Sequence, residues 1–201
     1  MSSPALNAPL HQRRSLVLAD LVPGALVRDV LLVVGGAALT GLLAQLAFPV
    51  PGSPVPVTGQ TFGALTVGAV LGWQRGLLSL ALYLVAGVVG VPWFAGGASG
   101  AAGASFGYVI GFMVAAGVVG ALASRGADRH VLPAVATMVL GNAVIYAFGL
   151  PYLMAVLHVD LGTAFSVGMK NYLLGDALKI ALAAACLPGA WRVMDRLHRR
   201  G

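Results

Sequence analysis

The chain has 201 residues, of which 59% are hydrophobic and only 9% are charged, and its formal net charge is +6. A soluble domain carries about a quarter of its residues as charged groups, so this composition excludes a water-soluble globular protein and predicts a membrane protein. The length allows one compact transmembrane domain, residues 1–201. A single cysteine, Cys186, excludes an intrachain disulfide.

The N-terminal segment, residues 1–27, precedes the first apolar run. Arg13-Arg14-Ser15 has only a faint likeness to a twin-arginine signal, because Asp20 and Pro23 interrupt the apolar stretch and no small-residue cleavage site follows. We expect this segment to be a tail that ends in a short interfacial helix over residues 16–27.

Six apolar segments follow, and each is interpreted as a transmembrane helix. Their ranges are 29–48, 61–72, 76–91, 105–124, 131–152 and 169–191. The second is shorter than the roughly 20 residues that a bilayer requires, so loop residues must extend it or it must stay buried among other helices. The predicted fold class is an all-α membrane protein, with a six-helix bundle over residues 28–191.

All ten arginines fall on one side of this map. They precede the first segment, join the second to the third and the fourth to the fifth, or follow the sixth in the basic tail 192–201. By the positive-inside rule, the N and C termini are both cytoplasmic. This placement favours a role for the arginines in topology and in contacts with membrane lipid, rather than a nucleic-acid surface.

The two long connections on the other side carry distinctive residues. Four prolines lie within residues 49–56, which forbids a helix and favours a stiff, extended segment; it could be a lid over a pocket or a plain connector. The glycine-rich connection 91–103 can leave backbone N–H groups open to a ligand. Its Trp93 and Phe94 could be interface anchors or aromatic walls of a site.

Within that connection, Gly97-Ala98-Ser99-Gly100 fits the G-x-S-G pattern of intramembrane serine proteases. A serine nucleophile needs a base within hydrogen-bond reach. The four histidines lie in tails and loops, none inside an apolar segment. The protease interpretation is therefore weak.

The sixth segment contains two charged residues, Asp176 and Lys179. Three positions apart, they share a face of a helix. A charge near the bilayer centre costs several kcal/mol unless it is paired or lines a polar cavity, so the pair predicts a functional site, with a structural ion pair as the alternative.

In order along the chain, these motifs resemble the BioY family, the biotin-binding S components of energy-coupling factor (ECF) transporters. The resemblance covers about residues 28–190. It is carried by Pro54-Val55-Pro56-Val57-Thr58-Gly59-Gln60-Thr61, Gly90-Val91-Pro92, Gly107-Tyr108, Gly141-Asn142, Ile145-Tyr146, Gly149-Leu150-Pro151 and, above all, Gly175-Asp176-Ala177-Leu178-Lys179.

The resemblance implies a six-helix S component that captures biotin and is not an enzyme, in the cytoplasmic membrane of a prokaryote. Its partners would be a transmembrane T component and two cytoplasmic ATPases. No G-x-x-x-x-G-K-[ST] phosphate loop occurs in this sequence, and no cofactor or metal is expected. The alternative is an S component for a different vitamin.

The residues suggest how biotin could be held. The neutral ureido ring offers N–H donors beside a carbonyl acceptor; Asp176 can only accept and Lys179 can only donate, and the resemblance places the head group at this pair. Tyr172, one turn away, would pack against the bicyclic ring or serve only as an aromatic packing residue. The candidates for the valerate carboxylate are polar groups: Gln60, Asn142, Ser99, Tyr108 or exposed loop amides.

The first apolar segment carries small residues on neighbouring stripes: Gly36, Ala37, Thr40, Gly41 and Ala44. Small residues four apart let another helix approach closely. By the resemblance this face would dock the T component; the alternative is ordinary packing within the bundle.

Overall fold

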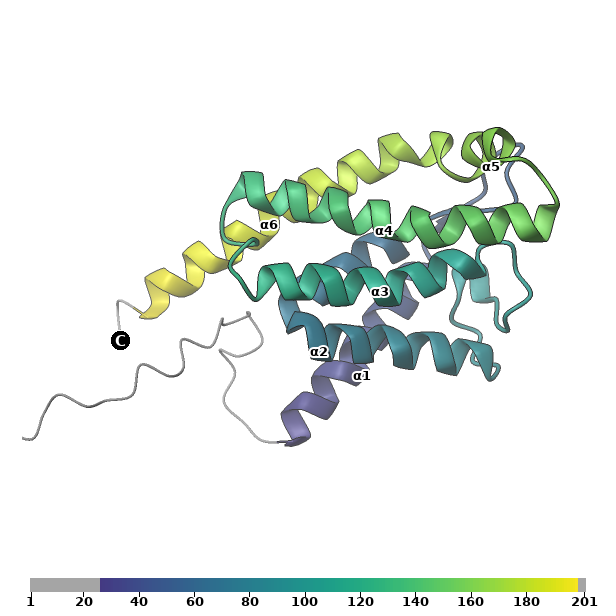
Figure 1. Cartoon of the computed structure of the whole chain (residues 1–201). Helices are drawn as coiled ribbons and strands as arrows, with labels where there is room; N and C mark the ends of the chain where they lie inside the picture. Colours follow the sequence, from purple (N-terminus) through teal and green to yellow (C-terminus); the bar gives the residue numbers. More distant parts are fainter. Residues whose placement is uncertain (1–25, 199–201) are drawn as a thin grey trace, which may run out of the picture.

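The computed structural model describes residues 26–198, with side chains described as far as Arg196. The described chain is almost entirely helical (Figure 1), with α1 Leu26–Ala44, α2 Gln60–Val88, α3 Phe106–Ala123, α4 Val131–Leu157, α5 Leu161–Gly168 and α6 Leu173–His198. Two short strands, β1 (Ala47–Phe48) and β2 (Val57–Thr58), pair antiparallel, and 3-10 turns lie at η2 (Ala95–Gly97) and η3 (Lys170–Tyr172). The predicted tail and most of the predicted interfacial helix lie outside the described residues.

Five helical segments of the described chain are long and apolar enough to cross a membrane: Leu26–Ala44, Gln60–Val88, Phe106–Ala123, Val131–Leu157 and Leu161–Arg196. The predicted second and third segments both lie within α2. At Gly72, however, the backbone leaves the helical region, with φ 80° and ψ 175°. Gln60 at the start of α2 donates a hydrogen bond of 2.5 Å to the hydroxyl of Tyr83 near its end. The chain therefore reverses at Gly72, and the halves 60–71 and 73–88 pack antiparallel.

Glycine is required at this reversal and beside it. The backbone angles of Gly72 belong to a region that is essentially open to glycine alone. A Cβ on Gly68 would lie 2.5 Å from the carbonyl oxygen of Ala116 on α3, and a Cβ on Gly120 would lie 2.5 Å from the carbonyl carbon of Gly72. The two halves of α2 and α3 thus meet at backbone contact, which only small residues allow.

Several predicted boundaries are wrong. α1 ends at Ala44 rather than 48, and α6 ends at His198 rather than 191. α4 continues through Pro151 to Leu157, rather than ending near residue 152, and α6 begins at Leu173 rather than 169. Between them lies the eight-residue helix α5, which is too short to be recognised as a membrane span from the sequence. The side chain of Asp160 caps α5 by accepting the N–H of Thr163 at 2.8 Å, which is the usual role of aspartate at a helix start.

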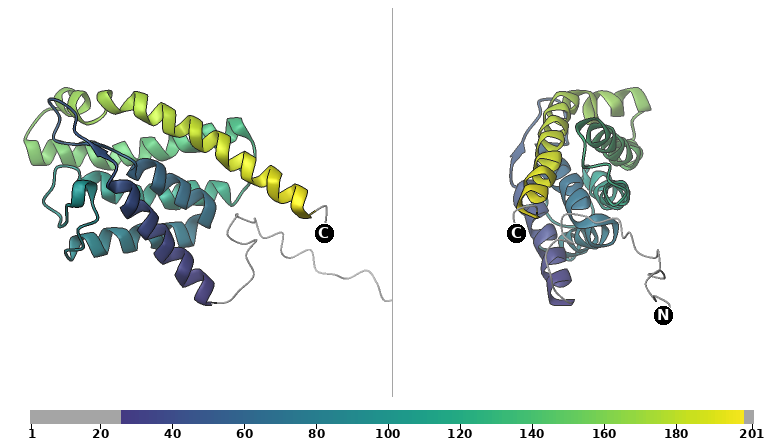
Figure 2. Two further views of the ribbon diagram at one scale, coloured as in Figure 1. Left: turned by 180° about the vertical axis from the view of Figure 1, so that it is seen from behind. Right: turned by 90° about the vertical axis from the view of Figure 1, so that its left-hand side faces the viewer.

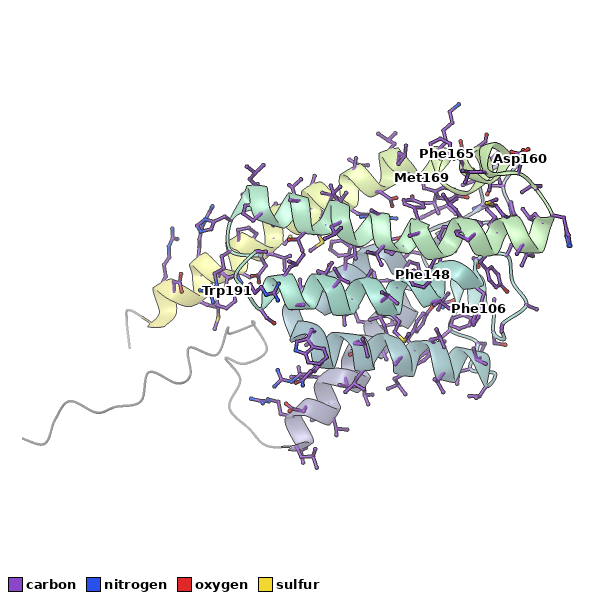
Figure 3. The ribbon with its side chains drawn as sticks, in the orientation of Figure 1. Phe106, Phe148, Asp160, Phe165, Met169 and Trp191 are labelled. Atoms are coloured by element: carbon purple, nitrogen blue, oxygen red, sulfur yellow. The ribbon has the colours of Figure 1, made fainter. Side chains whose placement is uncertain are left out.

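The helices pack as a bundle in which α3 lies between α2 and α4 (Figures 1 and 2). α1 packs on α2, and α6 crosses α4 obliquely. The β1–β2 hairpin, η2 and α5 lie toward one end of the bundle, whereas the start of α1 and the last turns of α6 lie toward the other. Figure 3 shows the same polarity, with Asp160 at the first end and Trp191 at the second.

Polar contacts join the connections at this second end. The carboxylate of Asp29 lies 2.9 Å from the guanidinium of Arg28 and 3.2 Å from that of Arg75. Trp191 donates a 2.6 Å hydrogen bond to Asp128, and Arg129 lies 4.4 Å above the ring of Trp191. Burial raises the pKa of the Asp128 carboxyl. At this end, Arg75 thus contacts the start of α1, and the α3–α4 connection contacts the last turns of α6.

Candidate functional site

A small cavity of about 40 Å³ lies under the hairpin, between α2, α3, α4 and α6. It collects residues from segments far apart in the sequence: Val55, Pro56, Thr58, Gln60, Thr61, Ala95, Ser105, Tyr108, Phe112, Asn142, Ile145, Tyr146, Gly168, Tyr172, Asp176 and Lys179. Six of the seven residues predicted for substrate binding are therefore brought together here; the exception is Ser99.

The centre of the cavity is the ion pair on α6. Asp176 is buried, with 5% of its surface exposed, and its Oδ1 lies 3.2 Å from Nζ of Lys179. Its Oδ2 accepts a hydrogen bond from the hydroxyl of Tyr146 on α4. Each carboxylate oxygen therefore has a donor, which offsets part of the cost of burying the charge. The expectation that Asp176 and Lys179 lie side by side is confirmed.

Tyr146 was not predicted to line the site, although Ile145-Tyr146 is one of the motifs that carry the family resemblance. It lies four positions after Asn142, so the two share a face of α4. That spacing is the signal that could have found it. Its ring also meets that of Tyr108 edge to face at 6.2 Å, which builds one aromatic side of the cavity.

Asn142 brings an unsatisfied acceptor to the cavity. Its Nδ2 donates to the carbonyl of Met138 at 3.0 Å, but its buried Oδ1 has no hydrogen-bond partner among the described residues. A buried acceptor without a donor costs about 1–3 kcal/mol. The free Oδ1 of this amide can therefore accept a hydrogen bond from an N–H group of a ligand. Its second Nδ2 proton can instead donate to the carboxylate of a ligand.

Gln60 and Tyr108 line the cavity with their polar groups already engaged. Gln60 donates to Tyr83 and accepts from Thr58 at 3.1 Å, which leaves one amide proton. Tyr108 donates its hydroxyl proton to the carbonyl of Gly168 at 2.9 Å. As a donor to a carboxylate, Gln60 is therefore better placed than Tyr108.

Tyr172 links the hairpin to the helical end of the site. Its hydroxyl donates to the carbonyl of Val55 and lies 2.6 Å from Oγ of Ser53, which in turn lies 2.6 Å from the carbonyl of Val167. Because Val55 and Pro56 form part of the cavity wall, the proline-rich connection covers the cavity. Of the two interpretations left open by the sequence, this geometry supports the lid.

The glycine-rich connection contributes less than expected. Ser99 is exposed and lines a neighbouring pocket that shares Gln60, Ala95 and Ser105 with the cavity. No histidine is among the described residues that line this pocket, so the G-x-S-G pattern has no base there. Trp93 donates to the carbonyl of Tyr83 at 2.9 Å, and Phe94 packs edge to face on the Tyr83 ring at 5.3 Å. These two aromatics support Tyr83, and through it Gln60, without lining the cavity.

The small-residue stripe of α1 faces inward, which favours the packing alternative over a docking face. All five of its members are buried: Gly36, Ala37, Thr40, Gly41 and Ala44. A Cβ on Gly36 would lie 2.6 Å from Oγ of Ser79, and one on Gly41 3.2 Å from the ring of Trp93. The small residues let α1 lie close to α2 and to the 91–103 connection. This is the ordinary packing within the bundle that the sequence left as the alternative.

Comparisons with known proteins agree with this architecture. Residues 12–196 match the model of the BioY family. The chain is 34% identical to the "Biotin transporter BioY" of Rhizobium etli over 65% of this chain and 75% of that one. It is 35% identical to the "Probable biotin transporter BioY" of Pyrococcus horikoshii over 78% and 91%, respectively.

A solved structure has the same fold. The S-component for biotin from an ECF-type ABC transporter superposes with a TM-score of 0.73 at 22% identity, covering 87% of this chain and 93% of that one. The multi-pass helical architecture described above is thus an S-component fold.

Proposed function

The chain belongs to the BioY family, and from that premise we propose that it captures biotin in the cavity around Asp176 and Lys179, as the S component of an ECF transporter in a prokaryotic membrane. The observation that carries the proposal is this buried ion pair, which lines a cavity with polar groups from three other helices. A charged pair in an apolar bundle marks a binding site more often than it marks packing.

The ureido ring of biotin matches the polar groups at the centre of the cavity. An N–H of the ring can donate to the carboxylate of Asp176, and the ring carbonyl can accept from Lys179. Charge-assisted hydrogen bonds of this kind are roughly twice as strong as neutral ones. The unpartnered Oδ1 of Asn142 can accept the second N–H, while Gln60 is our candidate for the carboxylate.

The function is tested directly by binding. Purified chain in detergent should be stabilised by biotin without ATP or partner proteins, because a ligand at a hundred times its Kd adds about 2.7 kcal/mol to the folded state. Thermal unfolding is measured with biotin, thiamin and riboflavin side by side. A shift with another vitamin alone would favour a different S component, and no shift with any of them would refute the proposal.

Entry of biotin requires the cavity to enlarge. Its volume of about 40 Å³ is far below the roughly 300–1,000 Å³ of ordinary ligand sites. The lid residues Ser53 and Val55 are fastened to Tyr172 and Val167 by hydrogen bonds, and neutral bonds of this kind are each worth only about 1 kcal/mol. We therefore assign the opening movement to the hairpin.

Ser53→Ala should accelerate release of biotin up to about tenfold, because it removes bonds that hold the lid closed. Dissociation of labelled biotin is followed after dilution into excess unlabelled vitamin. Ser99→Ala, in the neighbouring connection, is the matched control and should release biotin at the unchanged rate. Equal rates for both variants and the parent chain would show that this fastening does not control release.

The membrane arrangement follows from the same proposal. The two antiparallel halves of α2 would count as two crossings, which gives six with both termini on the cytoplasmic side, as the arginine positions require. Energy would come from a T component and two ATPase subunits. With the small stripe buried, one exposed row of α1 is Leu31, Gly35, Leu39 and Leu42, and we place the contact with the T component there.

Gly35→Leu tests this docking face. Within the described part of the chain, no atom beyond the neighbouring backbone of α1 lies within 4 Å of a Cβ at Gly35, so the variant should fold and bind biotin normally. It should nevertheless lose most co-purification with a T component, because the added side chain holds the partner helix away. Gly189→Leu on α6, where a Cβ is equally unobstructed, is the control. Undiminished co-purification of Gly35→Leu would place the contact elsewhere.

A further inference from the structure

A second pocket adjoins the cavity around Asp176 and Lys179. It has a volume of about 40 Å³ and is formed by the glycine-rich connection and the start of α3. Gln60, Ala95 and Ser105 line both spaces and form the boundary between them. Since neither Asp176 nor Lys179 lines the second pocket, it meets the cavity at a wall that the ion pair does not form.

The second pocket leads to the surface of the glycine-rich connection. Two of the residues that line it, Ala98 and Gly103, are exposed. The connection is nevertheless held in shape, because the N–H of Gly100 donates to the carbonyl of Gly87 at the end of α2, at 2.8 Å. A ligand that reaches the boundary from the cavity could therefore continue through this pocket to water.

Charge is confined to one part of this combined space. Among the described residues that line the cavity or the second pocket, Asp176 and Lys179 are the charged ones, and they pair with each other. The boundary offers a neutral donor, the one amide proton of Gln60 that is not donated to Tyr83; the Gln60 side chain is buried, with 5% of its surface exposed. An amide proton can bind a carboxylate oxygen or an amide oxygen alike.

This arrangement treats the two ends of biotin differently. The ureido ring meets the charged pair, whereas the valerate end meets neutral groups at the boundary. An ionised carboxylate without a cation beside it is costly to bury, so it must keep contact with water, which the second pocket allows. A group attached to the valerate carbonyl would then extend through this pocket toward the surface.

We propose that the chain captures biotin amides, in which a neutral amide replaces the carboxylate, as well as free biotin. The inference rests on the proposed biotin site and adds a class of substrate to it: the ureido ring decides recognition, and the charge of the valerate end does not. Biotin joined through its carboxyl group to the side-chain amine of lysine, or biotinyl-lysine, would place its lysine portion in the second pocket.

The test is competition with labelled biotin on the purified full chain, using unlabelled biotin, biotinamide and biotinyl-lysine. We expect the three Kd values to agree within about tenfold, because a neutral donor gains little more than that from a charged acceptor. A site that pairs the carboxylate with a cation would instead lose about two to four orders of magnitude with biotinamide, as for any unpaired buried charge.

The two proposals fail in different ways. Normal binding of biotin together with a loss of about a hundredfold or more for biotinamide would overturn the inference and leave the biotin site standing. If labelled biotin itself did not bind, the proposed function would be refuted, and the inference with it.

Ser105→Lys tests whether the valerate end lies at the boundary. The substitution places a cation there, and it removes no cap from α3, because the Ser105 side chain makes no capping hydrogen bond. The preference for biotin over biotinamide should rise about tenfold, since a charged donor strengthens the bond to a carboxylate most. An unchanged preference would mean that the carboxyl group binds elsewhere, and would overturn the inference.

Gly103→Leu tests the second pocket. The φ of Gly103 lies outside the left-handed region, and among the described residues beyond its chain neighbours a Cβ would meet only Oγ of Ser105, at 4.0 Å. The added side chain fills space that the lysine portion needs, so the affinity for biotinyl-lysine should fall about tenfold relative to that for biotin. Gly189→Leu is the control and should leave this ratio unchanged. The same ratio in Gly103→Leu as in the parent chain would overturn the assignment of the pocket to biotin amides.

Discussion

Replacing Asp176 by asparagine is expected to lower biotin affinity by about two to four orders of magnitude. Removing one member of a buried charge pair costs about 3–5 kcal/mol, and here the pair contacts the ligand. The side chain keeps its shape, but Lys179 loses its counter-charge, and one of the two oxygens that Tyr146 and Lys179 now contact becomes an amide nitrogen.

The amide also reverses one hydrogen-bonding role. An ionised carboxylate only accepts hydrogen bonds, whereas an amide donates from its nitrogen. In the variant, the amide nitrogen would therefore face another donor: Tyr146, Lys179 or the N–H of the ureido ring. Affinity is measured by isothermal titration calorimetry on protein shown to be folded by its unfolding temperature.

The matched control is Asp195→Asn, the same substitution on the same helix at an exposed position. It should leave affinity unchanged. If the folded Asp176→Asn chain bound biotin with the parental affinity, the ion pair would not bind the ureido ring. Other groups of the cavity would then have to recognise the ligand.

Gly120→Val is expected to prevent folding of the bundle. A Cβ at this position would lie 2.5 Å from the carbonyl carbon of Gly72 and 2.6 Å from the nitrogen of Trp73, and backbone atoms cannot move aside as a flexible side chain does. Overpacking in a core typically costs about 1–3 kcal/mol, and more when the backbone must shift.

The readout is the yield of monodisperse protein and its unfolding temperature. Gly189→Val, where a Cβ meets nothing within 4 Å, should behave like the parent chain. A Gly120→Val protein of normal yield and stability would mean that α3 and the reversal of α2 can separate without loss.

The sequence predicted most of the helices because apolar runs bounded by arginine or proline are a strong signal. The predicted boundary between the second and third segments lies within a few residues of Gly72, where α2 reverses. The second segment was predicted even though its twelve residues are too few to cross a bilayer. The reversal itself rests on contacts between backbones, such as Gly68 with Ala116, and these depend on which helices become neighbours.

The site was predicted in part for a similar reason. Asp176 and Lys179 stand out because charge is rare in this chain, so the cost of burial points to them. Tyr146 does not stand out, since a tyrosine in an apolar helix is ordinary until α4 is placed against α6. The stripe around Gly36 shows the same limit: small residues predict close approach of a helix, but not which helix, and here the neighbour is α2.

The ion pair of the cavity has a consequence for the electrical work of uptake. Of the described residues that line the cavity, Asp176 and Lys179 are the charged ones, and they cancel. Biotin carries its ionised carboxylate into the site, so the loaded site has a net charge of −1. Moving one elementary charge across the bilayer involves about 2.3 kcal/mol per 100 mV, and an inside-negative potential opposes inward movement of an anion. Uptake into vesicles should therefore slow as the interior is made more negative at constant ATP, unlike that of a vitamin bound as a neutral molecule.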